Sequence, residues 1–373
     1  MPASAIAPAA EWIDQPDALA AWLAALPPGA VVGADTEFMR RHTFYPQLAL
    51  LQLGCAGRHV LVDPTAFELG ELLQRALGQP GAPIAVMHSA SEDLEALAPW
   101  LPEGPHALFD SQIAAAFAGM GAGLSYRALV AELLDVELDK GETRSDWLQR
   151  PLTASQRDYA VLDVVHLTQV HALLHERLAA RDRLGWHAED CQRLKRRASA
   201  RRGEDQPQRA FRSAAEWPPE WQARLRRLLL WRDRTARALD CPRPWLLEDA
   251  LVLDLAERPP TEMRVLEERC RGQRALRAAQ RSELLAQLTA PLDASELAAT
   301  IAIPALPHGE AKKALGAMKQ AVDALAAQLD LPAGLLCPRK ALEDYVVTMQ
   351  WPELLDGWRR QVLEARLAPL LPG

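Results

Sequence analysis

The pattern of hydrophobic positions divides the chain into a front part with alternating strand-like and helix-like segments and a rear part with helical periodicity only. Four short apolar runs bounded by turn residues predict strands at Val31–Phe38, Leu48–Leu53, Arg58–Val62 and Ile84–Met87. Helical spacing predicts helices at about Phe67–Leu77, Ala90–Ala98, Ser111–Ala118, Tyr126–Leu133 and Ala154–Arg177. Strands that are followed by helices indicate an α/β domain with a mixed sheet flanked by helices.

Three polar positions indicate where helices begin. Ser89 with Glu92, and Thr153 with Gln156, have the spacing of a capping box, in which each side chain bonds to the other residue's backbone N–H. Asp110 has the position of a simple N-cap. We therefore expect helices to start beside these residues.

The rear part contains an internal repeat with a period near 90 residues. Leu239-Asp240-Cys241-Pro242 matches Leu329-Asp330-Leu331-Pro332, and each match precedes a helical segment, at Glu248–Ala256 and Arg339–Thr348. Two copies of one small helical domain explain this pattern. The predicted domain boundaries are 1–197 for the α/β domain, 198–212 for a linker, 213–294 for the first helical copy and 295–373 for the second.

The composition is that of an ordinary globular protein, with 49% hydrophobic and 24% charged residues in a chain of 373. No apolar stretch is long enough to span a bilayer, and the first residues do not have the form of a signal peptide. Five cysteines without C-x-x-C spacing argue against a disulfide framework and a structural zinc site. We therefore expect a cytoplasmic location.

The charge is distributed unevenly along the chain. Residues 1–190 have a net charge of −13, residues 191–373 a net charge of +6, and residues 191–237 alone a net charge of +9. An acidic front joined to a basic middle fits an anionic substrate that meets bound cations in one place and side-chain cations in another. The alternative is that the basic segment is a solvated helical face.

Acidic residues in three separate segments form the candidate chemistry. Asp35 and Glu37 point to the same face of a strand, a pattern that on its own is more typical of a solvent-exposed face. Asp93 follows a short apolar strand, and Tyr159 and Asp163 share one face of a predicted helix. If the four carboxylates converge, they repel one another unless cations neutralise them, and Mg²⁺ or Mn²⁺ prefer such oxygen ligands.

These residues and their surroundings resemble a known nuclease family. The stretches "DTEFMRRHTFYPQLALLQLG", "HSASEDLEAL" and "LDKGETRSDWLQRPLTASQRDYAVLDV" resemble the ribonuclease D branch of the DEDD-superfamily 3′–5′ exonucleases, tyrosine subgroup. The resemblance covers about residues 11–190, and the two helical copies resemble HRDC domains. It implies an RNase H-like fold for the front domain, followed by two small all-α domains.

The resemblance also implies an activity. Asp35, Glu37, Asp93 and Asp163 would hold two divalent cations, Mg²⁺ or Mn²⁺, and Tyr159 would position the attacking water. The reaction would release nucleoside 5′-monophosphates from RNA with a free 3′ end, such as tRNA precursors, with neither a nucleotide cofactor nor a membrane partner. A 3′–5′ exodeoxyribonuclease and a noncatalytic RNA-binding scaffold remain the alternatives. No P-loop sequence is present, so a helicase motor is not supported.

Basic, aromatic and amide side chains near these motifs are candidate RNA contacts. They are Arg41, Tyr45, Gln47, His88, Lys140 and Arg144 in the front domain, and Arg224 and Arg227 in the first helical copy. Each has an ordinary structural alternative, and for His88 that alternative is a buried, hydrogen-bonded histidine. Residues 295–373 carry 8 basic and 9 acidic side chains, so we expect the second copy to serve architecture more than phosphate binding.

Overall fold

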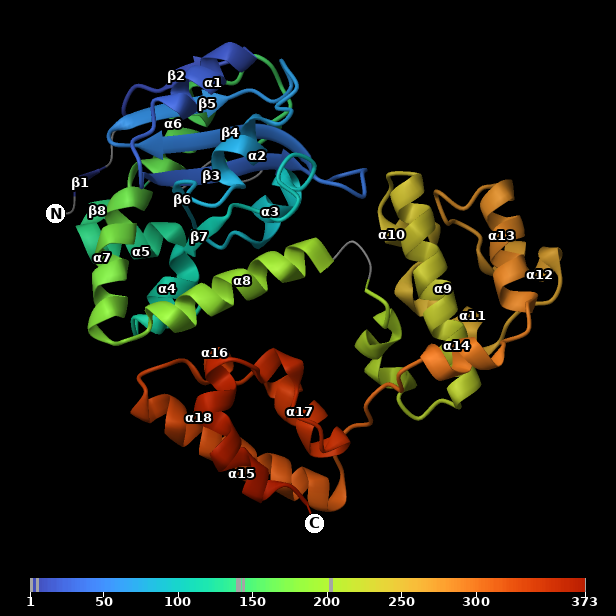
Figure 1. Ribbon diagram of the computed structural model, residues 1–373. Coiled ribbons are helices and arrows are strands. Elements are labelled where there is room, and N and C mark those ends of the chain that lie inside the picture. Colours follow the sequence, from blue (N-terminus) through green and yellow to red (C-terminus); the bar gives the residue numbers. More distant parts are fainter. Residues whose placement is uncertain (1–2, 5–6, 139–141, 143–144, 201–203, 373) are drawn as a thin grey trace.

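The structure is a computed structural model that describes residues 3–4, 7–138, 142, 145–200 and 204–372. Figure 1 shows three parts: a sheet with its helices, a group of helices beside it, and a second group below. We call them the sheet region (residues 7–200), the first helical region (α9–α14) and the second helical region (α15–α18). Within the described residues no strand follows residue 137, as the sequence predicts.

The sheet region contains a six-stranded mixed sheet in the order β2-β5-β4-β3-β6-β7. Its strands are β2 Glu11–Ile13, β3 Val31–Met39, β4 Gln47–Cys55, β5 Arg58–Val62, β6 Ile84–Met87 and β7 Ala107–Asp110. Strand β4 runs antiparallel to both β3 and β5, whereas the pairs β2–β5, β3–β6 and β6–β7 are parallel. A separate short pair joins β1 (Ala3–Ser4) to β8 (Val136–Glu137).

Helices cover both faces of this sheet, which confirms the predicted α/β fold. They are α1 Pro16–Ala24, α2 Leu72–Leu77, α3 Ser91–Leu97, α4 Ser111–Phe117, α5 Tyr126–Leu134, α6 Ala154–Val165, α7 Leu167–Ala180 and α8 Leu184–Ala200. Leu19, Leu73 and Leu94 of the first three helices share one buried cluster with Val32 of β3. On the opposite face Val161 of α6 packs against β4.

The four predicted strands exist with small changes at their ends, but β2 and β7 were missed because each offers only three or four residues of pattern. The predicted long helix at Ala154–Arg177 is broken at His166 into α6 and α7. Thr153 and Gln156 form the predicted capping box, and Asp110 caps α4 by accepting from the amides of Gln112 and Ile113.

The capping prediction for Ser89 is wrong. The helix α3 begins at Ser91, its N-cap position is Ala90, and no side chain caps it. Ser89 instead has a left-handed backbone with φ of 60°. The chain must turn sharply from β6 into α3, and this turn takes the residue out of the extended conformation that a capping serine adopts.

The two helical regions begin with the same succession of a long helix, a one-turn helix and a helix of nine or ten residues, and they differ after it. The first contains α9 Pro219–Ala238, α10 Arg243–Leu246, α11 Asp249–Glu257, α12 Met263–Arg269, α13 Ala278–Thr289 and α14 Ala294–Ala299. The second contains α15 Gly309–Gln328, α16 Ala333–Leu336, α17 Arg339–Thr348 and α18 Trp358–Leu367. Short 3₁₀ turns lie at Pro207–Ala210, Arg212–Ala214, Glu353–Leu355 and Ala368–Leu370. The helices α9 and α15 each have 20 residues.

The repeated Leu-Asp turn contacts the sheet region in both copies. Asp240 and Asp330 each follow the long helix with a positive φ, of 43° and 49°. The Asp240 carboxylate accepts hydrogen bonds from the amides of Phe44 and Tyr45 in the β3–β4 loop. The Asp330 carboxylate lies so close to Gly119 that a Cβ there would be 2.3 Å from Oδ2. The repeat thus supplies an equivalent docking turn to two different places on the sheet region.

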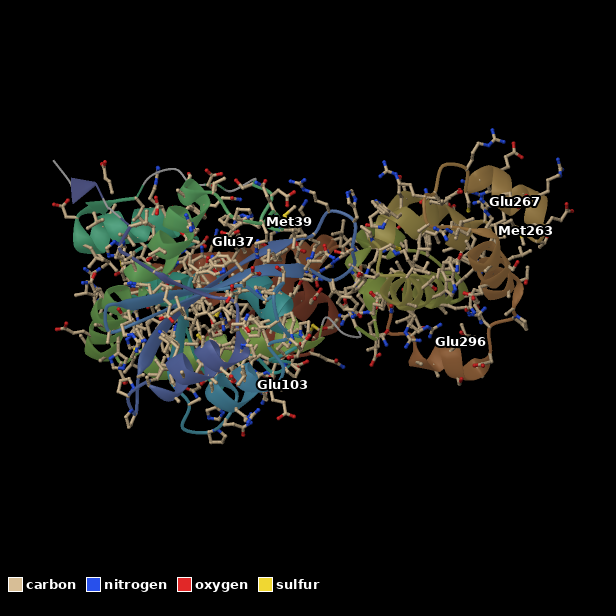
Figure 2. All side chains as sticks on the ribbon, turned by 90° about the horizontal axis from the view of Figure 1, so that it is seen from above. Glu37, Met39, Glu103, Met263, Glu267 and Glu296 are labelled. Atoms are coloured by element: carbon tan, nitrogen blue, oxygen red, sulfur yellow. The ribbon has the colours of Figure 1, made fainter. Side chains whose placement is uncertain are left out.

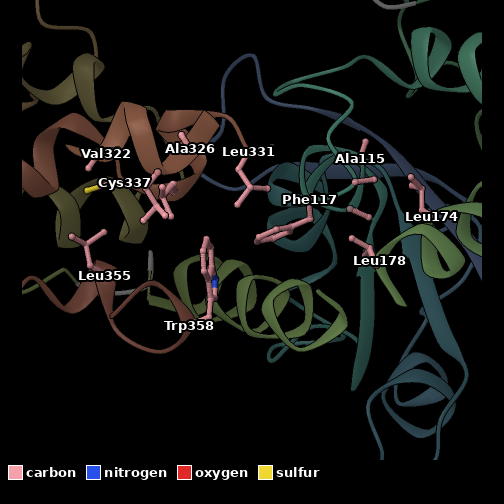
Figure 3. Close-up of a cluster of buried hydrophobic side chains, with 14 of the residues drawn as sticks. Ala115, Phe117, Leu174, Leu178, Val322, Ala326, Leu331, Cys337, Leu355 and Trp358 are labelled. Carbon is pink, nitrogen blue, oxygen red and sulfur yellow. The ribbon is translucent and has the colours of Figure 1, made fainter. Parts of the chain in front are cut away.

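The second helical region shares a hydrophobic core with the sheet region (Figure 3). Trp358 of α18 is fully buried, stacks on Trp186 of α8 with ring centroids 4.5 Å apart, and meets the edge of Phe117 of α4 at 5.3 Å. The Trp358 indole N–H donates to Asp190, whose carboxylate also pairs with Arg359 at 2.5 Å and 2.7 Å. Through this continuous core the second helical region is packed as one unit with the sheet region.

Packing differs from the predicted boundaries in two places. Helix α8 extends to Ala200, and Gln208 of the predicted linker is fully buried beside α9. Helix α14 begins at the predicted boundary between the helical copies, yet Glu296 on it pairs with Arg227 of α9, and Ile303 belongs to the core of the first helical region. Residues as far as Ile303 therefore pack with the first helical region.

Candidate active site

Strand β3 carries the first two acidic residues on one side of the sheet. Asp35, Glu37 and Asp163 each contribute a carboxylate oxygen that lies within 4.8 Å of the other two. The pairing of β3 with β4 shifts register directly after Glu37, so that Ala49 of β4 is an extra residue. The carbonyl of Ala49 accepts a hydrogen bond of 2.6 Å from Arg150. Bulges of this kind redirect a side chain and are common beside active sites.

Asp93 reaches the same place from α3. Its side chain is 7% exposed, and its Oδ1 accepts a hydrogen bond of 2.5 Å from the hydroxyl of Thr36, the residue between Asp35 and Glu37. Thr36 is not among the predicted site residues, although its hydroxyl lies between two acidic strand positions in the sequence. This hydrogen bond holds the Asp93 side chain in place relative to strand β3, which carries Asp35 and Glu37.

Asp163 is brought to the strand by a close approach of helix α6. Gly33 and Gly54 face each other on β3 and β4 beneath the end of that helix. A Cβ on Gly33 would lie 3.0 Å from the carbonyl oxygen of Val164, and one on Gly54 would lie 3.4 Å from it. Because both positions lack a side chain, the turn that carries Asp163 can sit directly on the sheet. The two glycines are positioning residues that the sequence reading overlooked.

Tyr159 lies one helical turn before Asp163, as predicted, and its hydroxyl forms a hydrogen bond with the Asp163 carboxylate. Its ring packs 6.0 Å from the ring of Trp147. Burial, and after it the charge of Asp163, raise the pKa of Tyr159. The phenol therefore stays protonated and can orient a ligand by hydrogen bonding, but it cannot serve as a general base near neutral pH.

The carboxylates of the cluster strongly resist ionisation. Burial raises the pKa of Asp35 well above its usual value, and the charges of Asp93, Asp163 and Glu37 raise it further. Burial raises the pKa of Glu37 to about 9, together with the charges of Asp163 and Asp93. Burial raises the pKa of Asp163 to about 7 and that of Asp93 to about 6, even though hydrogen bonds from Tyr159 and Thr36 oppose these shifts.

Such a donor set fits divalent cations. All four side chains offer hard carboxylate oxygens, and three of them are close enough to share an ion. Bound positive charge would relieve the repulsion that raises their pKa values. Asp35, Glu37 and Asp163, with Asp93 beside them, are therefore the residues that would hold metal.

The affinity for Mg²⁺ should rise with pH. Because these carboxyls have raised pKa values, the ion-free folded protein binds more protons than the unfolded chain between about pH 4 and 9, so its stability falls as pH rises through that window. A metal ion binds only when those protons leave. For each proton released, the apparent affinity for the metal rises by up to about tenfold per pH unit. Calorimetric titration with Mg²⁺ at pH 6 and pH 8 in buffers of different ionisation enthalpy would count the released protons. Equal affinity at both pH values, with no proton release, would contradict the assignment.

The candidate RNA contacts of the front domain lie in different environments. Arg41, Tyr45 and Gln47 are exposed in or beside the β3–β4 loop. His88 is half-buried, and its two ring nitrogens lie 2.9 Å from the Ser111 hydroxyl and 3.0 Å from the Leu124 carbonyl, so it is a hydrogen-bonded structural histidine. Lys140 and Arg144 lie outside the described residues.

The two arginines predicted to contact RNA in the first helical region are engaged within the protein. Arg227 donates to the carboxylate of Glu296 and to the carbonyls of Gln287, Ala290 and Pro291, with a side chain only 10% exposed. Arg224 donates to the Ala256 carbonyl at 2.7 Å. Their positive charge therefore tethers helices α11, α13 and α14 to α9, and we assign both a structural role.

Comparisons with known proteins match most of the length of the chain. A family profile described as "3'-5' exonuclease" matches residues 10–179, and the HRDC domain profile matches residues 222–286. Ribonuclease D of Xanthomonas oryzae pv. oryzae is 40% identical over 361 residues, which span 96% of this chain and 98% of that protein. Ribonuclease D of Pseudomonas paraeruginosa is 34% identical over 95% of this chain and 96% of its own.

A solved structure extends the similarity to the whole fold. The crystal structure of Escherichia coli RNase D, described as an exoribonuclease involved in structured RNA processing, matches with a TM-score of 0.82 at 28% identity. The match covers 97% of this chain and 98% of that one. The fold and the carboxylate cluster define a 3′–5′ exonuclease followed by a helical HRDC region. The chain belongs to the ribonuclease D family, and it is a 3′–5′ exoribonuclease.

Proposed function

We propose that the protein hydrolyses the 3′-terminal phosphodiester of RNA with two divalent cations, Mg²⁺ or Mn²⁺, held by Asp35, Glu37, Asp93 and Asp163. The observation that carries this proposal is the convergence of three carboxylates within 4.8 Å, with Asp93 fixed beside them. When bound, such cations neutralise the developing charge on a scissile phosphate and lower the pKa of water.

The residues of the chain have separable tasks in this reaction. The four carboxylates, once deprotonated, hold the positive charge that attracts the phosphate. Tyr159, kept neutral and anchored to Asp163, would orient the attacking water through its hydroxyl. Water would attack the phosphorus and the bond to the O3′ of the preceding nucleotide would break. The shortened RNA would keep a 3′-hydroxyl, and the released product would be a nucleoside 5′-monophosphate, with no covalent intermediate on a side chain.

The substrates we propose are structured RNAs with a free 3′ end, such as tRNA precursors. The Escherichia coli relative is described as acting in structured RNA processing, and its chain matches this one over nearly the full length. We also propose that the second helical region is an HRDC-like domain, from its matching helix α15 and docking turn, and that it begins near residue 304.

We place this activity in the cytoplasm. The five cysteines are all unpaired and buried, which fits a reducing compartment. Within the described part of the chain, no helix has the length and apolar character to cross a bilayer.

A comparison of matched RNA and DNA oligonucleotides tests the proposed function. With Mg²⁺ or Mn²⁺ we expect the RNA to be shortened stepwise from its 3′ end into nucleoside 5′-monophosphates, at least about tenfold faster than the DNA. A chelator should stop the reaction, because the carboxylates then carry no cation.

The alternatives give different results in the same assay. Faster degradation of the DNA would identify an exodeoxyribonuclease. Tight RNA binding without any product, at every concentration of either metal, would identify a noncatalytic scaffold. An RNA blocked by a 3′-terminal phosphate serves as the control for attack at the free end.

A further inference from the structure

A pocket of about 490 Å³ lies between the sheet region and the first helical region. The sheet region contributes Arg40 and Tyr45 of the β3–β4 loop and Glu95 of α3, and the helical region contributes Asp233, Arg237 and Arg243. Its volume is within the range of small-molecule and cofactor sites. Neither the carboxylate cluster nor the docking of the second helical region accounts for this pocket.

The pocket adjoins the catalytic cluster along the chain. Arg40 follows Glu37 by three residues, a distance of about 10 Å along an extended strand. Glu95 is two residues beyond Asp93 on α3, and its carboxylate pairs with Arg40. Figure 2 places Met39 on the side of Glu37 that faces the first helical region. A nucleic-acid strand whose 3′ end reaches the carboxylates can therefore extend into the pocket.

The first helical region holds the loop of the pocket in a fixed shape. The Asp240 carboxylate accepts from the amide of Phe44 at 2.9 Å and from that of Tyr45 at 3.1 Å. The Phe44 ring lies against two guanidinium groups, with its centroid 4.6 Å from Arg237 and 4.5 Å from Arg243. These contacts order the loop before any ligand binds, which lowers the entropic cost of binding.

Tyr45 is the aromatic side chain that this arrangement leaves accessible. It is 45% exposed, and a hydrogen bond with Arg237 holds its side chain. A large aromatic group that is fixed but half exposed offers a face on which a planar ligand can stack. Bases of single-stranded RNA bind proteins in this way, largely independently of sequence.

The charges in the pocket favour a base over a phosphate. Arg40 pairs with Glu95, and both Arg237 and Arg243 pair with Asp233. With Arg232, which pairs with Asp249, and with Glu204, the lining has four guanidinium groups and four carboxylates, so its charges balance. A phosphate site needs excess positive charge. Paired guanidinium and carboxylate groups beside an aromatic ring instead offer hydrogen-bond donors and acceptors to the edge of a base.

We propose that this pocket receives a base of the RNA strand upstream of the scissile bond, stacked on Tyr45 and hydrogen-bonded by Arg243. At about 3.4 Å per stacked nucleotide, the separation from Glu37 corresponds to roughly two to four nucleotides from the 3′ end. The inference rests on the proposed function for the direction of the strand. It assigns to the first helical region the task of shaping an upstream subsite through Asp240.

Scanning RNA oligonucleotides with single abasic positions tests this subsite with the full-length protein. Each oligonucleotide lacks one base at position two to eight from the 3′ end, and its affinity is measured by fluorescence anisotropy with chelator present, so no hydrolysis is needed. We expect a loss of about tenfold to hundredfold in affinity at one or two adjacent positions. The Tyr45→Ala variant should bind the intact RNA about tenfold to hundredfold more weakly. In this variant no single abasic position should reduce the affinity more than the others.

Matched variants and a short substrate complete the test. Arg243→Gln should weaken binding of the intact RNA, whereas Arg258→Gln, an exposed ion-paired arginine of the same helical region outside the pocket, should not. At low substrate concentration the preference for the intact RNA over a dinucleotide, which is too short to reach the pocket, should shrink in Tyr45→Ala and persist in Arg258→Gln. A flat scan in the wild type, or a position-specific loss that persists in Tyr45→Ala, would overturn the subsite. Absence of hydrolysis of every substrate would instead refute the proposed function.

Discussion

Asp35→Asn is expected to reduce the rate of mononucleotide release on the order of a thousandfold or more. The substitution keeps the shape of the side chain but removes a negative charge from the centre of the cluster, where Asp93, Asp163 and Glu37 all act on it. Metal-assisted charge stabilisation contributes several kcal/mol to such reactions, and about 1.4 kcal/mol corresponds to a factor of ten in rate. The rate should be measured on a 5′-labelled RNA at saturating Mg²⁺.

The same variant should have the opposite effect on stability without metal. Folding of the ion-free protein must keep the buried Asp35 carboxyl protonated or charge it against its neighbours, and a neutral Asn removes this cost, so the thermal midpoint near neutral pH is expected to rise by about 2–4 °C for each kcal/mol removed. The further rise that Mg²⁺ gives the wild type should shrink, because the variant binds the ion more weakly. A variant that releases mononucleotides at the wild-type rate would exclude Asp35 as a metal ligand. A lower midpoint in the ion-free state would show that inactivity came from misfolding.

Trp358→Ala is expected to destabilise the sheet region and the second helical region together, by about 3–5 kcal/mol. The indole is fully buried between Trp186 and Phe117, and its N–H donates to Asp190. Its removal leaves a cavity in a core that both regions share. Urea unfolding should show a lower midpoint, and nuclease activity should be lost at a correspondingly lower urea concentration.

Trp221→Ala is the matched control for this prediction. Trp221 is a half-buried tryptophan of the first helical region, in edge contact with Trp217 at 5.8 Å. Its loss should cost less and should leave the unfolding of the sheet region unchanged, because within the described residues Trp221 is not part of the core that the sheet region shares with the second helical region. If Trp358→Ala shifted only helical unfolding and left the urea dependence of activity intact, the shared core would not couple the two regions.

The parts of the fold with strong local pattern were predictable from the sequence. Strands β5 and β6 and helix α17 have the predicted bounds, because alternating or helical spacing of apolar residues persists over each of them. The break at His166 and the left-handed Ser89 were not predictable, because each depends on how the next element packs. Helices α6 and α7 both pack against β3, and local propensity does not record this demand of the tertiary structure.

The candidate active site, too, was predictable from the sequence only in part. The types and order of the acidic residues, with Tyr159 one turn before Asp163, could be read from the chain because they are fixed by chemistry and by short-range spacing. Their meeting depended on the paired glycines Gly33 and Gly54 and on the Thr36 hydroxyl, which connect segments far apart in sequence.

The amino-acid sequence alone was enough to predict the α/β class and the repeated helical copies, and to propose the residues that carry the chemistry, since these depend on local periodicity and residue type. Whether an arginine can bind a ligand depends instead on packing between helices that are far apart in the sequence. Arg227 is occupied by Glu296 and three carbonyls, whereas Arg243 lies at a pocket beside the catalytic strand. A guanidinium has the same charge in both places, and only its surrounding acceptors determine whether it can meet a ligand.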